Sequence, residues 1–198
     1  MPWIIDYPQV LEQLTRQGLR CNYFNGGAFG FGPDATIHIR GWIGPEDSTI
    51  RPAARALARP VNPPYEANLA HMAVRAWQAV VPGLAWLMPL SHWHFELNDG
   101  SREWLPGLLE SLEIDPAHLV HRNTAAAIEF GNDDADALER TLRTLLEKLL
   151  ASDFMLAFPR RGILCNVHHH KQLWWVTDNI QLQQQLDAIG PETGCEVL

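Results

Sequence analysis

The spacing of apolar residues along the chain predicts helices in several segments. Leucines recur every three or four positions across residues 133–149, with charged residues in between, and a similar repeat across residues 65–81 ends at Pro82-Gly83. A repeat near 3.6 residues places the apolar side chains on one side of a helix, so both segments are predicted to be amphipathic helices. Shorter repeats bounded by Asp, Pro or Gly predict further helices at residues 6–17, 105–112 and 178–189.

Alternation of apolar and polar residues predicts strands elsewhere. Ile37, Ile39 and Ile43 alternate with polar residues and follow the turn signal Asn25-Gly26-Gly27. Residues 19–43 are therefore predicted to form a hairpin. Further segments rich in aromatic and β-branched residues predict strands at residues 92–97, 125–130, 154–158, 163–168 and 173–177.

The order of these elements predicts an α+β fold, a mostly antiparallel sheet with helices packed on it. The chain has 198 residues, a length compatible with one domain. Residues 44–64 contain five prolines and are predicted to be a surface connection. A domain ending there would hold about 44 residues, close to the lower limit for closing a core. We expect a single domain over residues 1–198, with a frayed tail at residues 190–198.

Composition and charge limit the classes of function. The chain is 46% hydrophobic and 19% charged, which is ordinary for a folded protein. Its net charge of -8 repels phosphate backbones and anionic bilayers, so we expect neither nucleic acid nor a membrane as partner. The chain start lacks a signal-peptide pattern, and no run of about 18 apolar residues occurs. We expect a soluble cytoplasmic protein of the bacterial type.

The three cysteines are odd in number and widely spaced, which argues against a disulfide framework or a zinc ribbon. Cys165 alternates with Ile163 and Val167 and is expected to be a buried, reduced thiol. Stability gives no reason to expect a cofactor, and zinc or another divalent metal is the one cofactor that the remaining residues suggest.

Histidines supply the candidate metal site. On the strand predicted at residues 92–97, His92, His94 and Glu96 share one face, because successive strand side chains point to opposite faces. Two imidazoles and a carboxylate suit zinc, iron or manganese. His168 or His170 on a neighbouring strand would supply a fourth ligand. A metal with one open position would activate water for hydrolysis.

A simpler interpretation fits the same residues. An amphipathic strand needs polar side chains on its solvent face, and histidine and glutamate serve there without any ligand. The segment His168-His169-His170 lies where the chain is expected to turn, and it also fits plain solvent exposure. Both interpretations stay open at the level of the sequence.

A second candidate site lies on the strand of the first hairpin. His38, Arg40 and Trp42 share one predicted face and would give a small-ligand cleft a titratable base and an anion-binding guanidinium. Exposed strand polarity explains them equally well. The chain also has eight tryptophans, and an exposed tryptophan patch would indicate a binding surface.

Three classes of function remain. One is a non-enzymatic interaction domain whose acidic surface neutralises a protein partner, and another is a small-ligand domain using the His38 face. The third is a metal-dependent hydrolase using the His92 face. Neither G-x-S-x-G nor H-E-x-x-H occurs, which favours the two binding classes. Exposed strand edges and aromatic residues also suggest a homodimer.

Overall fold

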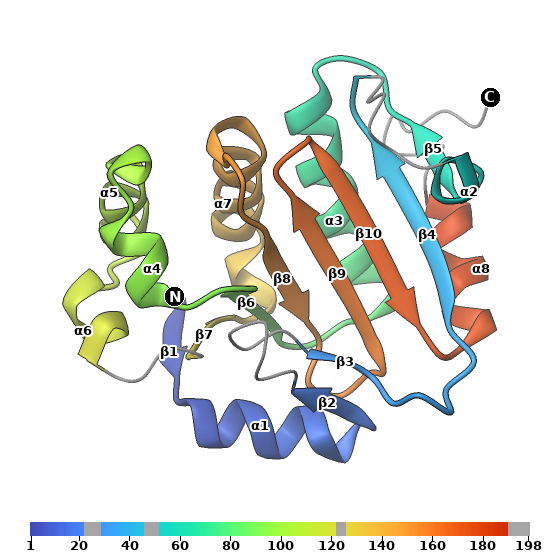
Figure 1. The fold of residues 1–198 in the computed structure, drawn as a ribbon, viewed down its shortest axis with the longest axis horizontal. Coiled ribbons are helices and arrows are strands. Elements are labelled where there is room, and N and C mark those ends of the chain that lie inside the picture. Colours follow the sequence, from blue (N-terminus) through green and yellow to red (C-terminus); the bar gives the residue numbers. More distant parts are fainter. Residues whose placement is uncertain (22–28, 46–51, 122–125, 190–198) are drawn as a thin grey trace.

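An eight-stranded sheet forms the centre of the computed structural model, which describes residues 1–21, 29–45, 52–121 and 126–189 (Figure 1). Its strands are β1 (Trp3–Ile5), β4 (His38–Ile43), β5 (Ala58–Pro60), β6 (Ala85–Pro89), β7 (Ala127–Phe130), β8 (Phe154–Ala157), β9 (Ile163–His168) and β10 (Gln172–Thr177). They lie in the order β1-β7-β6-β8-β9-β10-β4-β5, and every neighbouring pair is antiparallel except β4 and β5. The predicted α+β fold with a mostly antiparallel sheet is confirmed.

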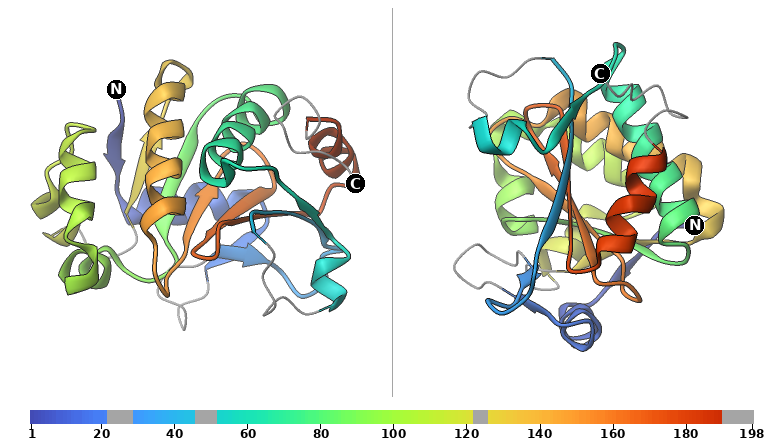
Figure 2. Two further views of the ribbon diagram at one scale, coloured as in Figure 1. Left: turned by 90° about the horizontal axis from the view of Figure 1, so that it is seen from above. Right: turned by 90° about the vertical axis from the view of Figure 1, so that its right-hand side faces the viewer.

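Helices cover the sheet unevenly on its two faces. The helices are α1 (Tyr7–Arg16), α2 (Pro52–Arg55), α3 (Tyr65–Val80), α4 (Trp93–Asn98), α5 (Trp104–Glu110), α6 (Pro116–His121), α7 (Ala135–Lys148) and α8 (Ile180–Ile189), with 3₁₀ turns at Gly100–Arg102 and Asn132–Asp134. Helices α3, α7 and α8 pack on one face, while α1 lies on the other with a two-stranded hairpin of β2 (Leu19–Cys21) and β3 (Phe29–Phe31) (Figure 2). Within the described ranges, no helix combines the length and apolar character needed to cross a bilayer.

The two faces of the sheet belong to two separate hydrophobic cores. Ala85 and Leu87 of β6 pack into the large core under α3 and α7, and Trp86 and Met88 pack into the smaller core under α1. This division follows from the two-residue period of a strand. Every residue of β6 is buried as a result, so its sequence shows no polar alternation and did not predict a strand.

Several local predictions are confirmed. The apolar repeats predicted at residues 65–81 and 133–149 form α3 and α7, and the final predicted helix forms α8. Gly18 follows α1 with a φ of +79°, the left-handed conformation that glycine adopts at helix ends, and its N–H donates to the carbonyl oxygen of Thr15. Cys165 is fully buried as a free thiol, and this burial raises its pKa well above the ordinary value.

The strand predicted at residues 92–97 is wrong, because this segment forms α4. The alternating pattern would bury Trp93 together with Phe95, yet the structure buries Trp93 with Glu96, three residues on, and leaves Phe95 61% exposed. The indole of Trp93 donates to the carbonyl oxygen of Ala126 at 2.6 Å and packs edge-on against Phe154. These tertiary contacts favour a helix over the alternation of the local sequence.

Part of the predicted surface connection at residues 44–64 is regular, since it contains α2 and β5. The hairpin predicted at residues 19–43 is divided: β2 pairs with β3, whereas β4 joins the main sheet beside β10. Its turn signal Asn25-Gly26-Gly27 and the tail predicted at residues 190–198 lie outside the described residues.

A glycine of β4 and the side chain of a tryptophan of β10 lie in close contact. Trp174 lies opposite Gly41 in the ladder. A Cβ atom built at Gly41 would lie 2.4 Å from the indole ring, far inside van der Waals contact. The absence of a side chain at Gly41 therefore lets the Trp174 ring lie against the neighbouring strand.

Candidate metal centre

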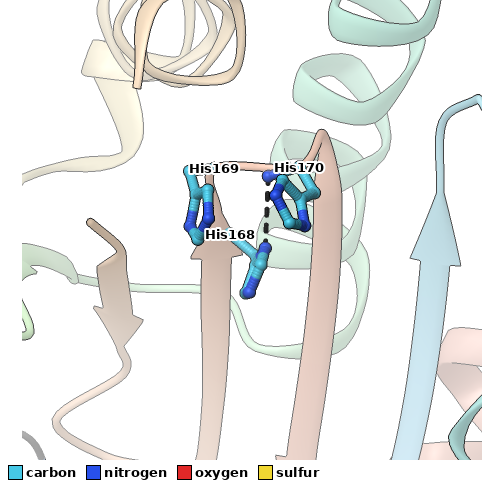
Figure 3. A group of neighbouring side chains, drawn as sticks. All are labelled: His168, His169 and His170. Atoms are coloured by element: carbon cyan, nitrogen blue, oxygen red, sulfur yellow. Dashed lines mark hydrogen bonds between the residues drawn. The ribbon is translucent and has the colours of Figure 1, made fainter. Parts of the chain in front are cut away.

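The β9–β10 hairpin carries three consecutive histidines at its tip (Figure 3). His168 ends β9 and lies opposite Gln172, which begins β10, so three residues form the loop. Lys171, the last of them, has a φ of +57°, as the third residue of a three-residue hairpin loop often does. This tight reversal brings the side chains of His168, His169 and His170 together. In a continuous strand, the side chains of consecutive residues would point to opposite faces.

One ring nitrogen from each histidine lies within 4.8 Å of the others. The ring centroids are 4.3 Å apart for His168 and His169, 4.2 Å for His169 and His170, and 5.1 Å for His168 and His170. Tetrahedral zinc holds its nitrogen ligands about 3.3 Å from one another, so the ring nitrogens would have to move closer together on binding. The rings of His168 and His169, which are stacked with only 19° between their planes, would have to turn toward the shared ion. In the described part of the chain, no other group of three His, Cys, Asp or Glu side chains meets this spacing.

Asp153, the residue before β8, orients His169. Its Oδ1 atom lies 2.9 Å from His169 Nδ1 and accepts the backbone N–H of His169 at 3.1 Å. A carboxylate only accepts hydrogen bonds, so it favours the tautomer protonated at Nδ1 and leaves the lone pair of Nε2 for a metal. Metal-ligating histidines commonly have such a carboxylate behind them.

His168 is held by the hairpin backbone. Its Nδ1 atom accepts the N–H of His170 at 3.1 Å, the bond drawn in Figure 3, and its Nε2 lies 3.8 Å from Asp153 Oδ2. Asn166 donates to the same Oδ2 at 3.4 Å. A metal bound at Nδ1 of His168 would replace its hydrogen bond from the backbone.

The positive charge beside the histidines is neutralised. Lys171 forms an ion pair with Glu66 in the first turn of α3. The hydrogen bond from Lys171 lowers the pKa of Glu66, which therefore stays ionised at neutral pH. The Lys171 ammonium consequently opposes a bound cation less than an unpaired one would.

The predicted metal ligands are only partly brought together. His168 and His170 belong to the cluster, whereas His92, His94 and Glu96 do not. His92 precedes α4 and His94 lies exposed within it. His94 and Glu96 are two residues apart on this helix and therefore point about 200° apart, so the shared face expected from a strand does not exist there. Glu96 is instead buried in an ion pair with Arg102.

The second predicted site lies under α8. Arg40 donates to Asp187 of α8 at 3.1 Å, and Arg59 donates to the Asp187 carbonyl oxygen at 3.0 Å. Trp42 is fully buried and packs edge-on against Trp175, while His38 lies half-buried at the start of β4. Core packing and the attachment of α8 account for Trp42 and Arg40, and ligand binding by this face stays a prediction.

The sequence did not predict His169, the third histidine of the cluster, or Asp153, which hydrogen-bonds to it. Counting alternate strand positions selected His168 and His170 and passed over the residue between them. The turn predicted at this segment could have indicated that His169 lies beside its neighbours, since a tight loop brings consecutive residues together. Nothing in the sequence pairs Asp153 with a residue 16 positions away.

Comparisons with known proteins add no further constraint. No family model matches the sequence, no curated protein matches it, and no solved structure matches the fold.

Proposed function

We propose that this protein binds a divalent transition metal of the zinc, copper or nickel type through His168, His169 and His170. The observation that carries the proposal is the convergence of three imidazoles on one hairpin, with Asp153 behind one of them. Imidazole nitrogen is a preferred ligand of these ions.

The surrounding charges support a cation. The three imidazoles are neutral ligands, and Asp153 places a carboxylate next to two of them. The net charge of -8 further raises the local concentration of cations around the protein.

Three nitrogen ligands would leave a tetrahedral ion one position for water or a small ligand. Water in such a position loses a proton near neutral pH, which is the chemistry that the hydrolase hypothesis needs. The proposal thus keeps the metal of that hypothesis and moves it from the His92 segment to the hairpin. A protein partner and a homodimer stay predictions.

The test compares zinc binding by three forms of the untagged protein after chelator treatment. The wild type and the double variant His92→Ala/His94→Ala should each bind one zinc ion, with affinities within about twofold of each other. The triple variant His168→Ala/His169→Ala/His170→Ala should lose this binding. Competition with a chromophoric chelator gives the affinities, and circular dichroism checks that each variant is folded.

Thermal and urea unfolding provide a second readout. Zinc at one hundred times its dissociation constant should raise the free energy of unfolding of the wild type by about 2.7 kcal/mol, and that of the triple variant not at all. Stoichiometric binding by the triple variant, or no binding by the wild type, would overturn the proposal.

A further inference from the structure

A cleft of about 390 Å³ lies between α4 and the loop that joins α7 to β8. Its polar lining includes Ser91, His94, Asn98, Asp99 and Ser152, and its apolar lining includes the largely exposed ring of Phe95. The hydrogen bonds within this lining determine what the cleft offers to a ligand.

The cleft wall contains a buried carboxylate, Glu96, that accepts hydrogen bonds from its neighbours. Glu96 is 1% exposed and pairs with Arg102, which is 7% exposed. The hydroxyl of Ser91 donates to Glu96 Oε1, and the hydroxyl of Ser152 donates to Oε2 at 3.2 Å. A hydroxyl has a single proton, so both serine oxygens can only accept from a further partner.

Asn98 and Asp99 also offer acceptors, whereas the buried Nε of Arg102 is a donor without a hydrogen-bond partner among the described residues. The amide nitrogen of Asn98 donates to the carbonyl oxygen of His94 at 2.6 Å and lies 3.2 Å from His94 Nδ1, and the amide oxygen remains an acceptor. Asp99 accepts from the backbone N–H and the hydroxyl of Ser101, and the backbone bond is the main reason that its pKa is lowered. It is ionised at neutral pH.

The charges in the lining do not cancel. Arg102 offsets Glu96, to which it is bound, and lies 3.4 Å from Asp99 with its second terminal nitrogen. Two carboxylates against one guanidinium leave one net negative charge. A ligand that matches the cleft is therefore positively charged and rich in hydrogen-bond donors.

We propose that this cleft binds an ammonium or guanidinium group carried on an alkyl stem. Both groups are donors without acceptors, which complements the serine, amide and carboxylate oxygens. The ring of Phe95 would contact the stem or the cation itself. Such a group belongs to a free polyamine or amino-acid-derived base, or to a lysine or arginine of a partner polypeptide. The proposal does not depend on the metal site.

The test measures binding of agmatine and putrescine by isothermal titration of chelator-treated protein, so that metal plays no part. Asp99→Asn removes the charge and keeps an oxygen for the Ser101 N–H. Asp115→Asn is the matched control, because Asp115 likewise accepts the backbone N–H two residues later, from Ala117 at 2.9 Å. We expect saturable one-to-one binding by the wild type and by Asp115→Asn, and about fivefold weaker binding by Asp99→Asn.

Two further arms identify the source of the cation and the role of charge. A short blocked peptide with one arginine should match agmatine if the natural ligand is a side chain, and should bind much more weakly if it is a free base. Pentanol, which has a similar stem and no charge, should not bind. The proposal is overturned if no cation saturates the site, if pentanol binds as well as agmatine, or if both Asp variants weaken binding equally.

Discussion

The segment around His92 and the hairpin around His168 both contain closely spaced histidines, but only the hairpin brings its histidines together. In α4 the chain rotates by 100° per residue, so His94 and Glu96 point apart, and His92 precedes the helix in an extended conformation. At the hairpin tip the chain reverses within three residues, and His168, His169 and His170 meet. Histidine spacing therefore indicates a metal site only once the backbone conformation between the ligands is known.

The carboxylates of the two regions also differ in their burial and in their partners. Glu96 is buried and bound by a guanidinium and two hydroxyls, so it is fixed as part of the structure. The side chain of Asp153 is 18% exposed. It contacts imidazoles that could replace a present hydrogen bond with a bond to a metal ion. We infer that the first carboxylate mainly maintains the fold and that the second mainly prepares a site.

The largest expected effect comes from removing the partner of the buried carboxylate. Arg102→Met would leave Glu96 as an unpaired buried charge and should lower the free energy of unfolding by about 3–5 kcal/mol in urea titrations. Arg16→Met is the control, because Arg16 and its partner Glu12 are largely exposed, and it should cost less than about 1 kcal/mol. If both variants lost a similarly small free energy of unfolding, Glu96 would not be a carboxylate that maintains the fold, and the contrast with Asp153 would fail.

The second prediction concerns the other carboxylate. Asp153→Asn should weaken zinc binding by about 10–100-fold, because His169 loses the charged acceptor that fixes its tautomer. Asp34→Asn, at an exposed position, should leave the zinc affinity unchanged. Competition titrations measure both, and an unaltered affinity in Asp153→Asn would show that the carboxylate does not support the ligand.

The smallest effect involves the ion pair that attaches the hairpin to α3. Since the folded-state pKa of Glu66 is lowered, its contribution to stability is present above the ordinary value of 4.5 and is lost as the pH falls through the lowered value. Wild type should exceed Glu66→Gln in free energy of unfolding by less than about 1 kcal/mol at pH 6, as both partners are partly exposed. Urea titrations from pH 6 to pH 3 should show this difference disappear, and a constant difference would contradict the assignment.

Sequence reasoning succeeded where a segment has one buried face and failed where burial depends on distant partners. The leucine stripe of α7 predicts its own helix, because one side of it packs on the sheet. Strand β6 is buried on both faces, and β1 and β5 are three residues long, so none of them shows a period. Helix α4 was misassigned because Trp93 and Glu96 are fixed by long-range contacts.

The site followed the same division. Two of the three clustered histidines could be predicted, since they lie in one short segment whose unusual composition is visible. Asp153 could not be predicted, because β8 and β9 bring it to the histidines only through their pairing. The acceptor-rich lining near Ser152 was also hidden, since it depends on where each hydroxyl proton goes.

The contact between Gly41 and Trp174 has an evolutionary consequence. A Cβ at one position and an indole at the other exclude each other, although 133 positions separate them in the sequence. A larger residue at position 41 therefore requires either a shift of the Trp174 ring or a smaller residue at position 174. The two positions should therefore covary among descendants of this chain, with glycine kept wherever tryptophan is kept.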